Sequence, residues 1–185
     1  MKSTLFNMVA VLFTITLIAS AGVGAVNMIT EDAIAEANRQ ATVAAVANVL
    51  PAFEKSEMST MTIDEMPINI YTAVDGSGAV VGYAVETMTM SGFSGKVRMM
   101  VGFDAEGTIL NVNVLEQSET PGLGSKMCDD GNVLLASVQG KNPANLKLKV
   151  KKDGGDIDAL TAATISSRAY ADAVARAYEA FKVAS

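Results

Sequence analysis

The 185-residue sequence contains no histidine and no tryptophan, and its one cysteine is Cys128. Without histidine, the chain lacks the usual general base, the usual metal and haem ligand and the Ser-His-Asp triad. A single thiol cannot form an internal disulfide, a CxxC redox pair or an iron–sulfur site. Any redox chemistry must therefore come from a bound organic cofactor.

Positive charge is also scarce, because 14 lysines and arginines stand against 20 aspartates and glutamates, a formal net charge of −6. Proteins that bind nucleic acid need a basic surface to neutralise phosphates, so the acidic balance argues against such a partner. The length fits one membrane anchor followed by one domain of about 150 residues, which can bury a core without disulfides or metals.

The N-terminal region has no charged residue between Lys2 and Glu31. Within it, Leu5–Ile29 contains twelve Leu, Ile, Val or Phe residues. Each of these contributes roughly 0.3–0.6 kcal/mol to membrane insertion. A run of this length can cross the ~30 Å hydrocarbon layer of a bilayer. We therefore predict a transmembrane anchor in residues 1–30 and an exported domain in residues 31–185.

A cleaved signal peptide is the alternative, with Ala19-Ser20-Ala21 as its cleavage site. Apolar and small residues continue past this site to Ile29, which favours a retained anchor because the apolar core of a signal peptide is about 7–15 residues long. Lys2 precedes the span, and Glu31 and Asp32 follow it. By the positive-inside rule, the domain is predicted to face away from the cytoplasm, on the periplasmic or extracytoplasmic side of the bacterial inner membrane.

Two β-hairpins are predicted in the exported domain, because turn sequences lie between strand-like runs. The first joins Ile68–Val74 to Ala79–Met90 through Asp75-Gly76-Ser77-Gly78. The second joins Lys96–Phe103 to Thr108–Glu116 through Asp104-Ala105-Glu106-Gly107.

Helices are predicted at both ends of the domain. Glu31–Leu50 is expected to be a helix that continues from the membrane span, with Thr30 as its N-cap, and Ser166–Val183 forms the closing helix. The polar stretch Met58–Pro67 is expected to be a loop, and the alternating Leu146–Val150 a half-exposed strand. The predicted fold class is α+β, with an N-terminal transmembrane helix followed by a twisted antiparallel sheet packed with helices.

Hydroxyl side chains are concentrated just before the closing helix, in Asp158-Ala-Leu-Thr161-Ala162-Ala163-Thr164-Ile-Ser166-Ser167. Such hydroxyls can cap a helix, and the free N–H groups of its first turn favour a phosphate. An ordinary capped helix start explains the same residues, so the segment alone does not identify a binding site.

A second segment, Glu119-Thr120-Pro121-Gly122-Leu123-Gly124, combines a proline with two glycines. Proline fixes one torsion, and both glycines can take positive φ. Backbone of this kind can lie close against a flat ligand. A simple connecting turn is the alternative interpretation.

Together the two segments resemble the FMN-binding domain of the G subunit of the Rnf complex, a relative of the C subunit of the sodium-translocating NADH:quinone reductase. The family's attachment pattern is Asp, two residues, Ser or Thr, Gly, Ala, then Ser or Thr. This sequence supplies Asp158, Thr161, Ala162, Ala163 and Thr164 at those positions, with Ala162 in place of the usual glycine. The loop 119–124 and Gly92-Phe93-Ser94-Gly95 also look like the family's pattern.

The resemblance implies that a flavin transferase, using magnesium and FAD, joins FMN through its phosphate to the hydroxyl of Thr164. Asp158 is then expected to aid recognition by the transferase or to cap the turn. In the loop, polar groups of the flavin are expected to bond to Glu119 and Thr120, and its ring to pack on Leu123. The further cofactor-binding residues implied by the two motifs are Asp158, Thr161, Ala163, Glu119, Thr120, Gly122, Leu123 and Gly124.

The expected function is electron transfer by a subunit of a membrane-bound ion-translocating oxidoreductase of the Rnf type, which couples ferredoxin oxidation and NAD reduction to ion pumping. Its partners would be the other membrane subunits and the flavin transferase. The alternatives are a C-subunit-like component of the sodium-translocating NADH:quinone reductase, a stand-alone extracytoplasmic flavoprotein, and a signal-anchored binding or structural domain without redox activity.

Overall fold

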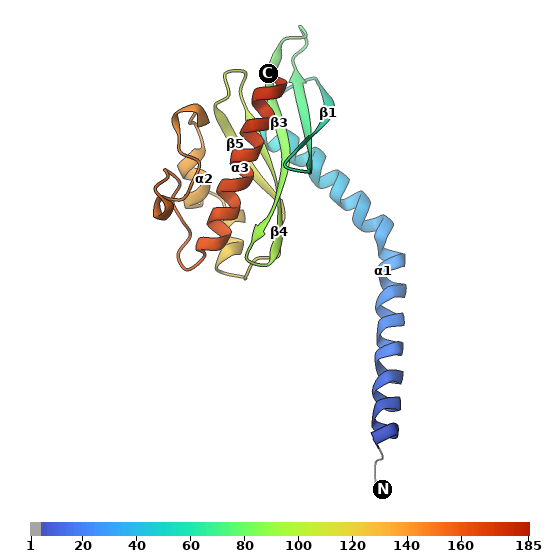
Figure 1. Cartoon of the computed structure of the whole chain (residues 1–185). Helices are drawn as coiled ribbons and strands as arrows, with labels where there is room; N and C mark the ends of the chain where they lie inside the picture. The colour runs from blue at the N-terminus through green and yellow to red at the C-terminus, as the bar shows by residue number, and fades with distance from the viewer. Residues whose placement is uncertain (1–4) are drawn as a thin grey trace. The chain divides into compact units, whose positions relative to one another are not determined.

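The computed structural model describes residues 5–185, which divide between Ala41 and Thr42 into two compact units. The elements in chain order are α1 (Leu5–Val49), β1 (Lys55–Ile63), β2 (Met66–Val74), β3 (Val80–Gly92), β4 (Gly95–Phe103), β5 (Ile109–Glu116), η1 (Gly124–Cys128), α2 (Val133–Val138), η2 (Pro143–Asn145), η3 (Lys151–Asp153) and α3 (Thr164–Ala184) (Figure 1). Helices η1 to η3 are short 3₁₀ turns.

Helix α1 runs without a break from Leu5 to Val49. The predicted continuation of the helix from the membrane span is confirmed. Thr30 is not its N-cap, because Thr30 lies inside α1 and its hydroxyl donates to the carbonyl of Val26 at 2.9 Å. The helix is long and apolar enough to cross a membrane, and the side chains of its apolar stretch are exposed. The predicted role of Lys2 in orientation lies outside the described residues.

The five strands form one antiparallel sheet in the order β1-β2-β3-β4-β5. Both predicted hairpins are confirmed. In each, the carboxylate of the aspartate that begins the turn accepts hydrogen bonds from backbone N–H groups of the loop. Asp75 Oδ1 accepts from the backbone N–H groups of Ser77 and Ala79. Asp104 Oδ1 makes the same type of contact with the N–H of Thr108 at 2.7 Å.

The prediction of a loop over Met58–Pro67 is wrong, because most of this segment belongs to strand β1 and the start of β2. The strand is exposed at most positions, so it lacks the apolar alternation by which half-buried strands are recognised. Its turn is made by Asp64 and Glu65 at φ +50° and +63°. Glycine or asparagine usually occupies such positions, so the turn carries no familiar signal.

The prediction of a strand over Leu146–Val150 is also wrong. Val150 alone makes a bridge there, a parallel pair with Ile157. The segment is held instead by nearby loop residues, since the backbone N–H of Lys147 donates to Asp156 Oδ2 at 2.7 Å. Alternating leucine and lysine therefore reflects a half-exposed loop segment that pairs with no strand of the sheet.

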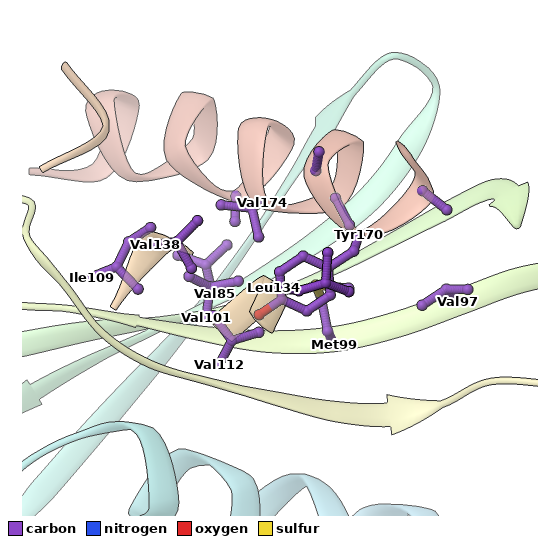
Figure 2. Close-up of a cluster of buried hydrophobic side chains, with 14 of the residues drawn as sticks. Val85, Val97, Met99, Val101, Ile109, Val112, Leu134, Val138, Tyr170 and Val174 are labelled. Carbon is purple, nitrogen blue, oxygen red and sulfur yellow. The ribbon is translucent and has the colours of Figure 1, made fainter. Parts of the chain in front are cut away.

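The core lies on both faces of the sheet. On one face, α3 packs across β3 and β4 with a fully buried set of small and apolar residues (Figure 1). Figure 2 shows Tyr170 and Val174 of α3 pointing toward Val85, Met99 and Val101 of these strands. On the other face, the last turns of α1 pack against the sheet through a second buried cluster of Ala45, Val46, Val49, Leu50, Ala73, Ala84 and Met100. The predicted α+β fold class is confirmed.

Candidate functional site

A cavity of about 310 Å³ brings together the two segments that stand out in the sequence. Small-molecule sites commonly enclose about 300–1,000 Å³, so this cavity can hold part of a flavin. Its lining consists of Phe93, Thr120, Leu123, Gly124, Ala162, Ala163, Thr164, Ile165 and Ser166. Three stretches of chain therefore meet here: the β3–β4 turn, the loop after β5 and the start of α3.

Thr164 is the first residue of α3 and is half-buried at the cavity wall. Among the described residues, its hydroxyl has no hydrogen-bond partner. The neighbouring Ser166 and Ser167 are buried, and both hydroxyls are engaged inside the protein. Thr161 is exposed and does not line the cavity. Of the four hydroxyls in residues 161–167, Thr164 thus offers a free one to a ligand in the cavity.

The start of α3 is fixed without a side-chain N-cap, because the N-cap position is Ala163. The expectation that a hydroxyl caps this helix is therefore wrong. Ser167 holds this end from within the first turn: its Oγ accepts from the N–H of Leu160 and donates to the carbonyl of Ala163, both at 2.9 Å. The first-turn N–H groups stay directed toward the residues that precede the helix.

Ala162 has φ +58°, in the left-handed region. A side chain there costs roughly 1–2 kcal/mol, whereas glycine adopts this conformation freely. The backbone at this position thus explains why glycine is the usual residue in the attachment pattern, and why alanine is tolerated only with strain.

The two glycines of the loop 119–124 differ. Gly122 has φ +76°, as expected, and its N–H donates to Ser125 Oγ at 2.9 Å. Gly124 is outside the left-handed region and is buried. A β-carbon on Gly124 would lie 2.8 Å from Glu119 Cβ and would also press on Ser166 Oγ, so this glycine is needed for close packing.

Glu119 lies behind the cavity wall and is 4% exposed. Its carboxylate accepts from the N–H of Phe93 at 3.2 Å, from the N–H of Ser94 at 2.9 Å and from the hydroxyl of Ser166. This one side chain joins the three stretches that form the cavity. Its predicted contact with the flavin itself stays a prediction.

Comparison with known proteins agrees with this geometry. The FMN-binding domain family matches residues 92–179, which include all three stretches. The G subunit of the ion-translocating oxidoreductase complex of Shewanella amazonensis is 35% identical over 173 residues, covering 86% of this chain and 80% of that protein. The chain belongs to this family of G subunits.

Other members of the family align over nearly the whole chain. The Shewanella baltica protein is 32% identical, covering 96% of this chain and 89% of its own length. The G subunit of the Na⁺-translocating ferredoxin:NAD⁺ oxidoreductase complex of Acetobacterium woodii is 29% identical, covering 91% and 87%. A crystal structure of Shewanella oneidensis NqrC aligns with a TM-score of 0.42 at 21% identity, over 72% of this chain and 65% of that chain, a likeness too weak to define the fold.

Asp158, at the other end of the attachment motif, does not line the cavity. Its carboxylate binds Lys151 Nζ at 2.7 Å, and its N–H donates to Ser137 Oγ at 2.9 Å. The hydrogen bond from Lys151 is the main reason that the pKa of Asp158 is lowered. The Asp158 side chain is thus tied to Lys151, and no hydrogen bond joins its carboxylate to a backbone N–H of the turn before α3 among the described residues. Both expected roles of Asp158, capping the turn and recognition by a transferase, stay predictions.

Two apolar side chains at the cavity were not predicted as site residues. Phe93 is 64% exposed and Ile165 is 46% exposed, and both line the cavity together with Leu123. Large apolar side chains left open beside a cavity are typical of a ligand or partner surface. Ile165 directly follows the attachment motif and Phe93 lies inside the Gly92–Gly95 segment. These positions in the sequence could have identified both as site residues.

Proposed function

We propose that this chain carries FMN joined through its phosphate to Thr164, and that it works as an electron-transfer subunit of a membrane-bound ion-translocating oxidoreductase. The observation that carries the proposal is the free hydroxyl of Thr164 at the wall of a cavity in an FMN-binding domain. The buried and engaged hydroxyls of Ser166 and Ser167 are poor acceptors by comparison.

The linking reaction is a phosphoryl transfer in which Thr164 Oγ is the nucleophile. A flavin transferase acting on FAD would form the bond between Thr164 Oγ and the FMN phosphorus. The bond between the two phosphates of FAD breaks, AMP leaves, and the threonine hydroxyl loses its proton. Placement of Thr164 at the first position of α3 supports this, because the N–H groups and dipole of a helix N-terminus favour the added negative charge.

The cavity suits the rest of the cofactor. Phe93, Leu123 and Ile165 offer apolar surface for a flat ring, while Thr120 supplies a hydroxyl. FMN supplies reversible electron transfer when bound, chemistry that no side chain in this histidine-free chain provides. The chain's own residues would hold the flavin, shield part of it from water and set its electrostatic environment.

The partners would be the other subunits of an Rnf-type complex, which couples ferredoxin oxidation and NAD reduction to ion pumping. The Acetobacterium woodii relative is named as a subunit of a ferredoxin:NAD⁺ oxidoreductase complex. The flavin would be the only electron carrier of this chain, and ferredoxin and NAD would bind other subunits of the complex. Residues 1–30 would anchor the chain, and the domain of residues 31–185 would lie outside the cytoplasm.

Orientation can be measured with a membrane-impermeant thiol reagent in intact spheroplasts. Partial burial raises the pKa of the Cys128 thiol, which slows its reaction, so Ser185→Cys at the chain terminus is a second reporter. Labelling of both cysteines in intact spheroplasts is expected. Labelling only after lysis would place the domain in the cytoplasm.

Purification from native membranes tests the function as a whole. A tag on this chain should recover a multi-subunit complex, and the denatured band of this chain should fluoresce as a flavin. A fluorescent chain that purifies alone would favour a stand-alone flavoprotein, and co-purification with a quinone-reducing complex would favour the C-subunit-like alternative. A complex without fluorescence in this band would contradict the covalent flavin.

A further inference from the structure

A buried glutamate without a cationic partner lies directly behind the candidate flavin cavity. Glu119 is 4% exposed, and in the described part of the chain it forms no ion pair with a lysine or arginine. Glu116, by contrast, pairs with Lys96 at 2.9 Å and with Arg98 at 3.4 Å. Glu119 is compensated only by hydrogen bonds, which is unusual because an unpaired buried charge is costly.

The hydrogen-bond donors around Glu119 are those that suit a carboxylate. Two are backbone N–H groups, from Phe93 and Ser94, and the third is the hydroxyl of Ser166 in the first turn of α3. Helix α3 has no acidic residue of its own in that turn, so Glu119 supplies the negative charge that a helix N-terminus favours. The structure therefore stabilises a negative charge here through fixed dipoles.

Two glycines make room for this carboxylate. A β-carbon on Gly92 would lie 2.8 Å from Glu119 Oε1, and one on Gly124 would lie 2.9 Å from Glu119 Oε2. Neither glycine has positive φ, so neither is required by backbone conformation. Glycine at both positions is thus needed for close packing, in which the Glu119 side chain takes part beside the Gly95 carbonyl oxygen at Gly92 and beside the Ser166 hydroxyl at Gly124.

Glu119 does not line the cavity, but two of the three residues that donate hydrogen bonds to its carboxylate do. Phe93 and Ser166 both contribute to the cavity wall, as does Gly124, which packs on the carboxylate. Three residues of the cavity wall therefore contact the Glu119 carboxylate directly. The site is partly shielded from water, so a charge at this range acts on a ligand more strongly than it would in bulk solvent.

We propose that Glu119 is a positioning residue that holds the three walls of the cavity together and keeps the reduction potential of the flavin low through its buried negative charge. This inference rests on the proposed flavin at Thr164. Reduction adds electrons to the flavin ring, and a fixed negative charge nearby makes that addition less favourable. The same contacts that shape the cavity thereby set how strongly the flavin-loaded chain reduces its partner.

The test compares variants that separate charge from packing in the full-length chain. Glu119→Gln and Glu119→Met remove the charge at similar length. Ser166→Ala removes one hydrogen bond and leaves the charge in place. Glu106→Gln, at an exposed turn residue, controls for the change in net charge. In-gel flavin fluorescence, circular dichroism and the midpoint potential of the flavin are measured for each protein.

The neutral Glu119 variants are expected to retain covalent flavin and to shift its midpoint potential to a more positive value, while Ser166→Ala gives a smaller shift and Glu106→Gln gives none. An unchanged potential in both neutral variants would overturn the inference, as would a positive shift of equal size in Ser166→Ala, which would assign the effect to packing. Loss of flavin from both neutral variants with an intact fold would also overturn it, because Glu119 would then act in maturation. Absence of fluorescence from the wild type would instead contradict the proposed function.

Discussion

Gly102 in β4 lies directly against Val49, the last residue of α1, such that a β-carbon on Gly102 would come within 2.8 Å of the Val49 carbonyl carbon. The end of α1 is thereby seated on the sheet, with Val49 fully buried. Replacing Gly102 with valine should lower the free energy of unfolding by about 1–3 kcal/mol, the usual cost of overpacking. Urea denaturation of the domain measures this change in the free energy of unfolding.

The control for Gly102→Val is Ser59→Val, an exposed position on β1 where valine also suits a strand. It should change the free energy of unfolding by less than about 0.5 kcal/mol. An equal loss in the free energy of unfolding in the two variants would contradict a stabilising role for the close contact between Gly102 and Val49.

The two loop glycines should respond differently to alanine. At Gly122 nothing lies near an added β-carbon, so the cost is the backbone strain of about 1–2 kcal/mol and flavin should remain attached. At Gly124 the β-carbon meets Glu119 and Ser166, which displaces the cavity wall. Urea denaturation should therefore show a larger loss of stability in Gly124→Ala than in Gly122→Ala. The reverse order would contradict the packing role of Gly124.

Ala162→Gly should stabilise the domain. It removes left-handed strain of roughly 1–2 kcal/mol but adds about 0.4–1 kcal/mol of chain entropy to the unfolded state, a net gain of about 0.5–1 kcal/mol. Ala159, which lies nearby, is outside the left-handed region, so Ala159→Gly only adds chain entropy to the unfolded state. It should lower the stability of the domain. Thermal unfolding of the two variants should move in opposite directions, and a loss in Ala162→Gly would mean that its φ is not strained.

Tyr170 is buried on the sheet-facing side of α3, and its hydroxyl has no hydrogen-bond partner among the described residues. Burial raises the pKa of this phenol well above its usual value. Above about pH 10 the unfolded chain loses the phenol proton while the folded chain keeps it, so the free energy of unfolding falls as pH rises.

Tyr170→Phe should weaken that alkaline loss and raise stability at neutral pH by about 1 kcal/mol, since it removes an unpaired buried hydroxyl. Denaturant unfolding at pH 7 and above pH 10 measures both effects. Tyr71, whose pKa is also raised by burial, stays in both proteins, so their difference isolates Tyr170. Identical pH dependence in the two proteins would contradict the burial of this phenol.

Much of the fold could be predicted from the sequence where structure is local. The hairpins at Asp75 and Asp104 were predictable because an aspartate bonds the N–H groups of its own turn. Strand β1 was not, because it is an exposed edge strand whose turn at Asp64 and Glu65 lacks glycine. The continuation of α1 beyond the membrane span was predictable, but the place of Thr30 inside the helix was not, because Thr30 matches an N-cap when only its neighbours in sequence are considered.

The site was predictable only in part. Thr164 and the loop 119–124 carry a family pattern, and the structure brings them to one cavity. The role of Glu119 depends on contacts with Phe93 and Ser166, which lie 26 and 47 residues away along the chain. No local pattern fixes such contacts, because they arise from the packing of α3 and the β3–β4 turn around the end of β5.

Mass spectrometry of the tryptic peptide Asp153–Arg168 from native membranes is the direct test of whether FMN is attached to Thr164. This peptide contains Thr161, Thr164 and both serines, so fragmentation must place the modification on one residue. We expect a mass increase of FMN less one water on Thr164, lost in Thr164→Ala, kept in Thr161→Ala and kept at least in part in Thr164→Ser. An unmodified peptide, or a flavin located on another residue, would contradict it.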